Sequence, residues 1–250
     1  MSHPDQSRAA EPATQTGLIG RSELLNSLGT TIATDKMAFS PRSLAESSNL
    51  WKITSHVYEP LWRVFSTHML TGGVWSLKRE CQIVSGWLSP KKEELFLDVG
   101  SSTGVYGRYV LEHHQESYAV FVDYSLPMLQ KAGKRMGNNR QRSVCIQCNA
   151  ASLPLKEGSV SGAVMGGTLN ELAEPEKVLR EILRVVIPGG NIVLMHLITR
   201  KAPGLIARGL KKAGIWLPSI SEADAMFHRC GYRILDTKTA GLMRIVHCKS

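Results

Sequence analysis

The chain has 250 residues, of which 43% are apolar, and a formal net charge of +9 at pH 7. This length suffices for one large hydrophobic core, or for one core and a small cap. Because no run approaches the roughly 18–20 apolar residues of a membrane span, we expect no transmembrane helix. The polar first 20 residues lack the apolar stretch of a secretory leader, and Asp5 and Glu11 are untypical of a transit peptide. We therefore expect a cytoplasmic protein.

The first third of the chain divides into two expected parts. Residues 1–48 are rich in Ser, Thr, Ala and Pro, which predicts a flexible N-terminal arm with one short helix at Ser22–Leu28. Residues 49–90 carry two helical patterns, at Trp51–Met69 and at Trp75–Trp87. The spacing of the first pattern fits a plain core helix as well as a cap over a binding site.

From residue 91 to residue 250, strand and helix patterns alternate. The expected strands are 95–99, 119–122, 144–148, 161–165, 191–198, 232–238 and 244–248, and the expected helices are 104–113, 127–136, 176–186 and 221–230. Because these strands are mostly apolar, we predict an α/β domain with a mostly parallel, doubly wound sheet covered on both faces. Ligands bind at the carboxyl ends of such strands, which puts Asp98, Asp123, Asn149, Glu171 and His196 on one rim.

The most informative segment is a glycine-rich turn. Asp98-Val-Gly100-Ser-Ser102-Thr-Gly104 follows an apolar strand, and the next strand ends on Asp123. A strand, such a turn and an acid at this distance indicate a nucleoside-cofactor site. The turn fails the dinucleotide fingerprint, because Ser102 and Val105 occupy two of its three glycine positions, and the phosphate-loop motif is absent. An acid before the turn would repel a pyrophosphate but suits the ammonium end of an amino-acid cofactor.

Here the chain resembles the class I S-adenosylmethionine-dependent methyltransferases, and within them the small-molecule, type 11 subgroup with quinone and sterol methyltransferases. Besides the turn, three segments carry the resemblance in the family's order and spacing: Asp123–Leu129, Asn149–Leu155 and Glu181–Gly190. The resemblance covers roughly residues 90–198. It implies a Rossmann-like, seven-stranded sheet with an antiparallel C-terminal hairpin, and N-terminal helices that cap the substrate pocket.

The resemblance also implies S-adenosyl-L-methionine as the cofactor and assigns residues to it. Gly100 and Gly104 would let the backbone approach it, Asp98 would lie near its methionine end, and Asp123 would accept both ribose hydroxyls. The other candidates are Tyr124 and Met128 beside the adenine, and Ser101, Ser102, Asn149, Ala150, Ala151 and Gly166. Taken singly, Asp98 or Asp123 could instead be a helix-capping acid.

Two residues depart from the family pattern. Ser102 stands where the family usually has glycine, and serine does not adopt a positive φ freely. Asn149 stands where the family has an acid that binds the adenine amino group, although its amide oxygen can accept the same hydrogen bond. We therefore expect weaker cofactor binding in an unchanged fold.

Methyl transfer from a sulfonium is an in-line displacement that depends mainly on alignment, and a base matters only if the nucleophile carries a proton. Glu171 and His196 lie on the expected rim, and Tyr58 lies in the segment that would cover it, so these three are the catalytic candidates. Each also has a structural interpretation: a helix-start acid for Glu171, a satisfied core histidine for His196 and simple packing for Tyr58.

A basic insertion is expected at residues 199–219. Residues 200–218 hold five basic and no acidic side chains. On a helical projection, Ile206, Leu210, Ala213 and Leu217 share one face, and Arg208, Lys211 and Lys212 share the opposite one. Such a segment is typical of contact with an anionic membrane surface, and it fits a substrate lid with a solvated outer face equally well.

The cysteines give no metal-site spacing. Cys145 and Cys148 form a C-x-x-C on an expected strand, where residues three apart face opposite sides. The remaining cysteines are Cys81, Cys230 and Cys248. We expect buried structural thiols and a reaction without a metal.

We therefore predict an enzyme, a monomer or homodimer, that methylates carbon or oxygen of a small lipophilic quinone-, isoprenoid- or polyketide-like substrate. One alternative is a protein of this fold without methyl transfer, such as an assembly factor, a regulator or a catalyst of a cofactor-assisted rearrangement. The net charge also suggests a second alternative, an RNA methyltransferase. However, no RNA-binding module is visible, and Asn170-Glu-Leu-Ala replaces the Asn/Asp-Pro-Pro-Tyr motif of base methyltransferases, so no nucleic-acid partner is expected.

Overall fold

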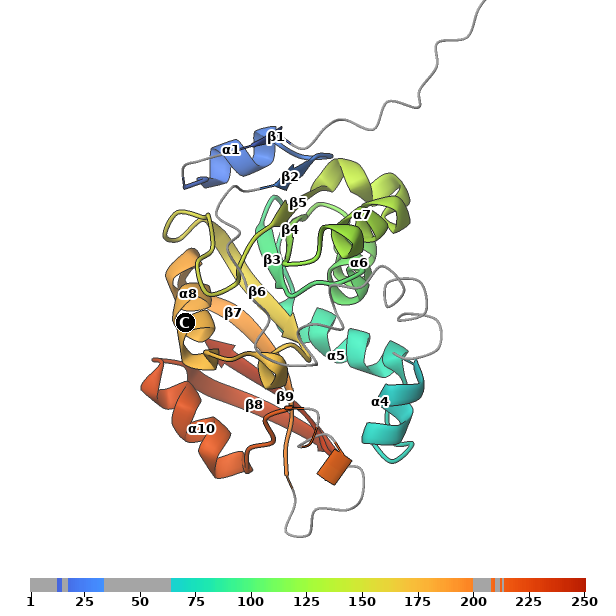
Figure 1. Cartoon of the computed structure of the whole chain (residues 1–250). Helices are drawn as coiled ribbons and strands as arrows, with labels where there is room; N and C mark the ends of the chain where they lie inside the picture. Colours follow the sequence, from blue (N-terminus) through green and yellow to red (C-terminus); the bar gives the residue numbers. More distant parts are fainter. Residues whose placement is uncertain (1–12, 15–17, 34–63, 200–207, 210–211, 213) are drawn as a thin grey trace, which may run out of the picture.

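The computed structural model describes residues 13–14, 18–33, 64–199, 208–209, 212 and 214–250 (Figure 1). The strands are β1 Ala13–Thr14, β2 Thr31–Ala33, β3 Leu95–Val99, β4 Tyr118–Asp123, β5 Ser143–Gln147, β6 Val160–Gly166, β7 Val186–Leu197, β8 Arg233–Ala240 and β9 Met243–Lys249. The helices are α1 Arg21–Asn26, α4 Val64–Leu70, α5 Leu77–Leu88, α6 Val105–His113, α7 Leu126–Arg135, α8 Pro175–Val185 and α10 Ile220–Arg229, with 3-10 helices at Gly137–Arg142 and Leu169–Glu171.

One nine-stranded sheet has the order β1-β2-β5-β4-β3-β6-β7-β9-β8. Neighbouring strands are parallel except for the pairs β7–β9 and β8–β9, which are antiparallel. The seven expected strands are neighbours in this order: β5, β4, β3, β6, β7, β9 and β8. The predicted fold class and its antiparallel C-terminal hairpin are therefore confirmed. The short strands β1 and β2 are additional and extend the sheet beyond β5.

Helices cover both faces of the sheet, α5, α6 and α7 on one side and α8 and α10 on the other (Figure 1). Successive residues of a strand point to opposite faces. In β3, Phe96 belongs to the core with Val110 of α6, whereas Leu97 belongs to the core with Ile182 of α8. This burial on both faces explains why β3 is apolar up to Asp98 near its carboxyl end.

Residues 18–33 correct the expectation of a flexible arm. Ile19 and Leu24 are fully buried, and Ile32 is nearly so, all in the core on the α8 side. The backbone N–H of Ile19 donates to the carbonyl of Pro154 at 2.8 Å. This part of the arm is therefore an integral part of the domain.

Several expected segments lie wholly or largely outside the described residues. They include residues 34–63, with the first part of the expected cap helix and Tyr58, and most of the basic segment 200–218. The boundaries of the expected arm, cap and insertion therefore stay predictions. Within the part of the chain that the structure describes, no helix combines the length and apolar character required to cross a membrane.

Strand β7 begins earlier than expected. Helix α8 ends at Val185, and Val186 already has an extended backbone and pairs with Val160 of β6. Pro188 and Gly189 were expected to separate helix and strand, but they lie within β7 and are exposed. The pairing of β6 with β7 is irregular at this point, as is typical where proline interrupts a ladder.

Candidate functional site

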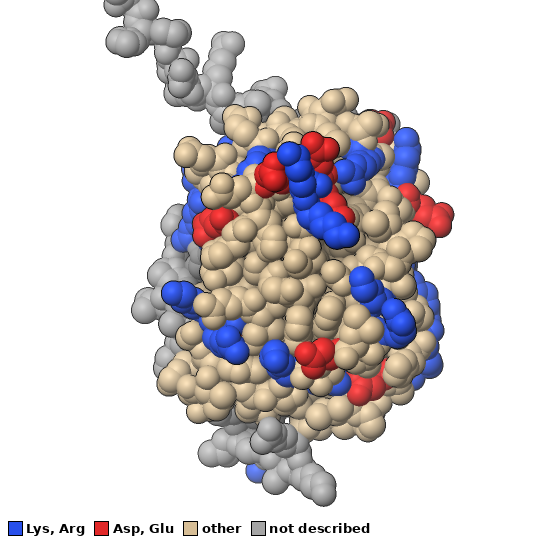
Figure 2. Space-filling model, turned by 180° about the vertical axis from the view of Figure 1, so that it is seen from behind, with Lys and Arg blue, Asp and Glu red and all other residues tan. Residues whose placement is uncertain are grey.

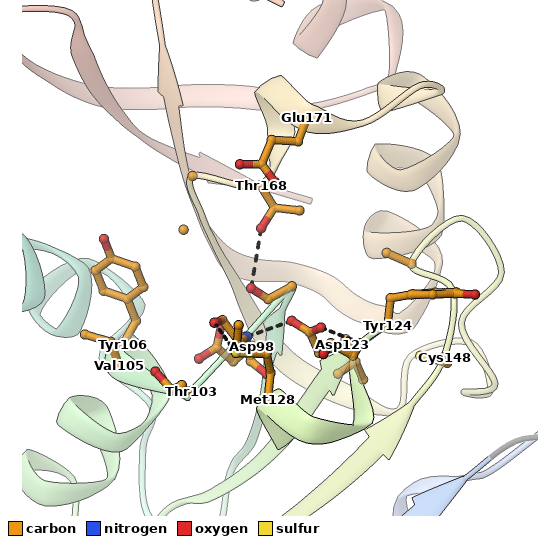
Figure 3. A pocket seen from close by; sticks show the side chains of 18 of the residues that line it. Asp98, Thr103, Val105, Tyr106, Asp123, Tyr124, Met128, Cys148, Thr168 and Glu171 are labelled. Atoms are coloured by element: carbon orange, nitrogen blue, oxygen red, sulfur yellow. Dashed lines mark hydrogen bonds between the residues drawn. The ribbon is translucent and has the colours of Figure 1, made fainter. Parts of the chain in front are cut away.

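A pocket lies at the carboxyl ends of the central strands β3, β4 and β6 (Figure 3). The expected cofactor residues line it, except Gly104 and Ala151: Asp98, Gly100, Ser101, Ser102, Asp123, Tyr124, Met128, Asn149, Ala150 and Gly166. Parallel strands end at the same edge of the sheet, which is why residues from three of the four motifs meet there: the turn, Asp123–Leu129 and Asn149–Leu155. The fourth motif, Glu181–Gly190, contributes no lining residue. The pocket is the site that the motif spacing predicts, while the role of each residue stays a prediction.

Asp98 is the last residue but one of β3 and contacts the first turn of α6. Its side chain is almost fully buried, and its Oδ2 accepts a hydrogen bond from the backbone N–H of Gly107 at 2.9 Å. A Cβ on Gly107 would lie 2.8 Å from the same Oδ2 and 2.7 Å from Cζ of the Phe121 ring. Asp98 is therefore a helix-contacting acid and a pocket residue at once, and glycine at 107 makes that approach possible.

Asp123 is held by backbone donors on both carboxylate oxygens. Its Oδ1 accepts from the N–H of Ser125, and its Oδ2 accepts from the N–H of Ser102, each at 2.7 Å. Burial raises the pKa of Asp123 above its ordinary value, and the surrounding backbone N–H groups act in the opposite direction. The carboxylate is half-buried and faces the pocket with a fixed orientation.

The turn between β3 and α6 requires three residues with positive φ. Gly100 has φ 61°, Ser102 has φ 50° and Gly104 has φ 76°. A Cβ on Gly100 would lie 2.8 Å from a side-chain carbon of Thr168. Ser102, which stands where the family usually has glycine, adopts the left-handed conformation at a cost of about 1–2 kcal/mol for a residue with a side chain. In exchange, its N–H reaches Asp123.

The expected adenine end of the pocket is lined by Tyr124, Met128 and Asn149. The Met128 sulfur lies 3.6 Å from the Ser102 hydroxyl. The amide oxygen of Asn149 accepts from the backbone N–H of Ala151 at 2.9 Å. An amide oxygen has two lone pairs, so it can still accept a hydrogen bond from a ligand, but its orientation is set by the loop.

Glu171 lines the pocket from the loop after β6, across from the β3 turn (Figure 3). The hydroxyl of Thr168 in this loop donates to the carbonyl of Gly100 at 3.4 Å, which links the two sides. Of the three catalytic candidates, the structure brings Glu171 to the pocket. Tyr58 lies outside the described residues.

His196 does not line the pocket, which corrects its expected position on the rim. Its side chain is fully buried beneath α10, with the ring edge-on to Phe227 at 5.5 Å between centroids. Burial, together with the nearby Arg244 cation, lowers its pKa to about 4. A proton acceptor must reach the reacting atom, so this placement supports the core-histidine interpretation.

Sequence reasoning missed several lining residues: Thr103, Val105, Tyr106, Val122, Ser125, Cys148, Gly167, Thr168 and Leu172. Most of them are chain neighbours of predicted site residues, so widening each motif by one or two positions would have found them. Cys148 was missed for another reason: the sequence analysis interpreted it as a structural thiol. All five cysteines are indeed free and buried, and Cys145 belongs to the core on the opposite face from Cys148.

Comparisons with known proteins agree with this geometry. Residues 97–194 match the family described as methyltransferase domain. The demethylmenaquinone methyltransferase of Desulfitobacterium hafniense (strain Y51) is 35% identical over 98 residues, 38% of this chain and 36% of that protein. The demethylmenaquinone methyltransferase of Clavibacter sepedonicus is 30% identical over 122 residues, 49% of this chain and 48% of that protein.

A solved structure of a SAM-dependent methyltransferase from Aquifex aeolicus has the same fold, with a TM-score of 0.61 at 18% identity over 80% of this chain and 98% of that chain. This chain spans less than half the length of the two curated relatives, so similarity alone does not transfer their whole activity. The matched domain, the fold and the three motifs around one pocket agree. Over residues 97–194, the chain is similar to the family described as methyltransferase domain, and its fold is that of the solved methyltransferase structure.

Proposed function

We propose that the pocket binds S-adenosylmethionine and that the protein transfers its methyl group to carbon or oxygen of a small lipophilic acceptor. The observation that carries this proposal is the Asp123 carboxylate, which faces the pocket and is fixed by two backbone N–H donors. Two oxygens held in one plane suit the paired hydroxyls of a ribose. The relatives named as demethylmenaquinone methyltransferases support a quinone-like acceptor.

The lining residues fit the cofactor in charge and in shape. Asp98 would place a negative charge near the amino group at the methionine end, and Asp123 would bind the ribose. The exposed part of Tyr124 and the Met128 thioether would provide apolar surface for the adenine ring. Glycine at 100 permits the close approach of Thr168, with which a Cβ would clash, and so the contact that joins the two sides of the pocket. When bound, the cofactor would supply the methyl group from its sulfonium, and the thioether that leaves is neutral.

The chain's own contribution is then alignment and exclusion of water. Fixed acids at Asp98 and Asp123 would hold the cofactor so that its methyl group points along the pocket toward the acceptor. Such alignment contributes up to ~7–11 kcal/mol in favourable systems. Glu171, on the opposite side of the pocket, is the candidate group to accept a proton where the acceptor carries one.

Calorimetric titration with S-adenosylmethionine and S-adenosylhomocysteine tests the cofactor site. We expect binding by the wild-type protein and its loss in Asp123→Ala. Asp236→Ala, an exposed aspartate on β8, is the matched control and should bind as the wild type does. Absence of wild-type binding would overturn the proposal and favour a protein of this fold that acts as an assembly factor or regulator.

Membrane contact through residues 200–218 belongs to the same proposal, because a lipophilic acceptor resides in a bilayer. On the face shown in Figure 2, Lys and Arg lie near Asp and Glu around a broad uncharged area, so the excess charge does not form one basic track there. Sedimentation with anionic liposomes at low salt tests the segment. The protein should pellet with them and remain in the supernatant with neutral liposomes, and failure to pellet with either would remove the membrane contact.

A further inference from the structure

One N-terminal segment holds both ends of the loop that lines the expected adenine end of the pocket. The loop comprises residues 148–154, and three of its members line the pocket: Cys148, Asn149 and Ala150. Residues 19–33, the clamp, pair with the strand before this loop and with the residue after it. None of the clamp residues lines the pocket itself, so any effect on a ligand must pass through the loop.

The clamp holds the end of the loop through the backbone of Ile19. The Ile19 N–H donates to the carbonyl of Pro154, and the Lys156 N–H donates to the carbonyl of Ile19, each at 2.8 Å. These two bonds form a parallel bridge between Ile19 and Leu155. The Glu23 carboxylate also lies 3.4 Å from Lys156 Nζ, but both side chains are partly exposed, so the backbone bonds are the main anchor here.

The clamp holds the start of the loop through the edge of the sheet, where β2 lies beside β5 (Figure 1). The Cys145 N–H donates to the carbonyl of Thr30 at 3.1 Å, and the pairing continues to Gln147, the last residue of β5. The side-chain amide of Gln147 donates in turn to the carbonyl of Tyr124, another pocket residue, at 3.1 Å. Without β2, β5 would be an edge strand, and edge strands open more readily than paired ones.

Burial keeps the clamp docked between its two anchors. Ile19 and Leu24 are fully buried and Ile32 is 3% exposed, in the same core as Leu153 and Leu155. Release of the clamp would expose these apolar side chains to water, which is unfavourable. The clamp lies outside the residues that match the methyltransferase domain, so it is an addition of this chain to that domain.

We infer that the clamp is a positioning element of the cofactor site, which sets the affinity for the adenosine part of S-adenosylmethionine by fixing both ends of residues 148–154. This inference rests on the proposed function and assigns part of its cofactor binding to a segment outside the pocket. A loop that is fixed beforehand loses less conformational freedom when a ligand binds. We expect the clamp to raise the affinity about 3- to 10-fold, the effect of having ordered one loop side chain in advance.

Hydrogen exchange in the wild-type protein tests this coupling without a substitution. Because coupling between two sites is reciprocal, a clamp that raises cofactor affinity must itself be stabilised by the cofactor to the same extent. Saturating S-adenosylhomocysteine should therefore slow amide exchange in residues 19–33 about 3- to 10-fold. Strand β8, at the opposite edge of the same sheet, is the matched control and should show no comparable slowing.

Ile19→Ala gives a second, independent measurement. It removes a fully buried side chain from the clamp, and Ile192→Ala, the matched control, removes the same fully buried side chain from β7 in the same core. At a temperature where both variants are folded, Ile19→Ala should bind S-adenosylhomocysteine about 3- to 10-fold more weakly than the wild-type protein does. It should lose the same factor for 5′-methylthioadenosine, which lacks the amino-acid part, and Ile192→Ala should keep both affinities.

The outcomes separate this inference from the proposed function. If the wild-type protein does not bind S-adenosylhomocysteine, the proposed function fails and the inference fails with it. If it binds but exchange in residues 19–33 is unchanged, or β8 slows equally, the inference alone is overturned. Wild-type affinity in a folded Ile19→Ala also overturns it, as does a loss confined to S-adenosylhomocysteine, which would place the effect at the methionine end. If Ile19→Ala does not fold, the exchange measurement decides.

Discussion

The pocket rim and the face beneath α10 both bury charged side chains, but they satisfy them in different ways. In the pocket, Asp98 and Asp123 accept hydrogen bonds from backbone N–H groups. Beneath α10, Arg244 is 3% exposed and forms two hydrogen bonds to the carboxylate of Asp224, at 2.6 and 3.2 Å. Backbone donors orient a carboxylate without neutralising it, so its charge remains for a ligand. In an ion pair each partner balances the charge of the other, so neither charge remains for a ligand.

The largest effect that separates the two regions is expected from Asp224→Ala. This change leaves the buried guanidinium of Arg244 without its partner, which typically costs ~3–5 kcal/mol. Because the Asp224 side chain is 30% exposed, water can reach the site, and we expect the free energy of unfolding to fall by about 3 kcal/mol. Urea unfolding measures the loss, and S-adenosylmethionine affinity should stay unchanged. A large loss of affinity in a folded variant would show that the regions are coupled.

The next effect is an acid-sensitive stability from His196. Its ordinary pKa is 6.5, and burial and Arg244 lower it to about 4 in the folded protein, with Asp224 acting in the opposite direction. The unfolded chain therefore binds the proton first as pH falls. Stability is present above pH 6.5 and is lost between pH 6.5 and pH 4, by roughly 2 kcal/mol on reaching pH 5.

Replacement of the histidine tests that window. The free energy of unfolding of His196→Gln should change less between pH 7 and pH 5 than that of the wild-type protein. Methyl-transfer activity at pH 7 should remain, because His196 does not line the pocket. A variant that kept the full acid sensitivity would assign the effect to other groups.

Gly107→Ala tests the close approach of Asp98 to α6. The new Cβ would meet both the Asp98 carboxylate and the Phe121 ring, and such overpacking outweighs the gain in helix propensity by a net ~1–2 kcal/mol. S-adenosylmethionine affinity should fall as well, since Asp98 must move. Gly86→Ala is the matched control: it is exposed on α5 with nothing near its Cβ, and it should stabilise the protein by about 1 kcal/mol.

Ser102→Gly should give the smallest change. It removes a side chain from a residue with φ 50°, which relieves ~1–2 kcal/mol of backbone strain but increases the flexibility of the unfolded chain. We expect the free energy of unfolding, measured by thermal denaturation, to rise by up to about 1 kcal/mol. Cofactor affinity should not fall, because the N–H that binds Asp123 is retained. A marked fall would assign a binding role to the serine hydroxyl.

The sequence by itself determined seven of the nine strands of the sheet and the position of the pocket. The apolar strand β3, the turn from Gly100 to Gly104 and the acid Asp123 at the end of β4 are local patterns, and parallel strands bring their carboxyl ends together. These features depend on residues close in the chain. They could therefore be predicted without knowing how distant segments pack.

Only the tertiary structure decided which polar residues face the pocket. His196 and Glu171 looked equivalent on the rim, but β7 turns the His196 side chain toward α10, while the loop after β6 points Glu171 inward. The burial of Ile19 and Leu24 and the contact between Glu80 and Tyr106 likewise join residues far apart in sequence. The side of a strand that faces a ligand depends on which helices cover each face, and no local pattern encodes that packing.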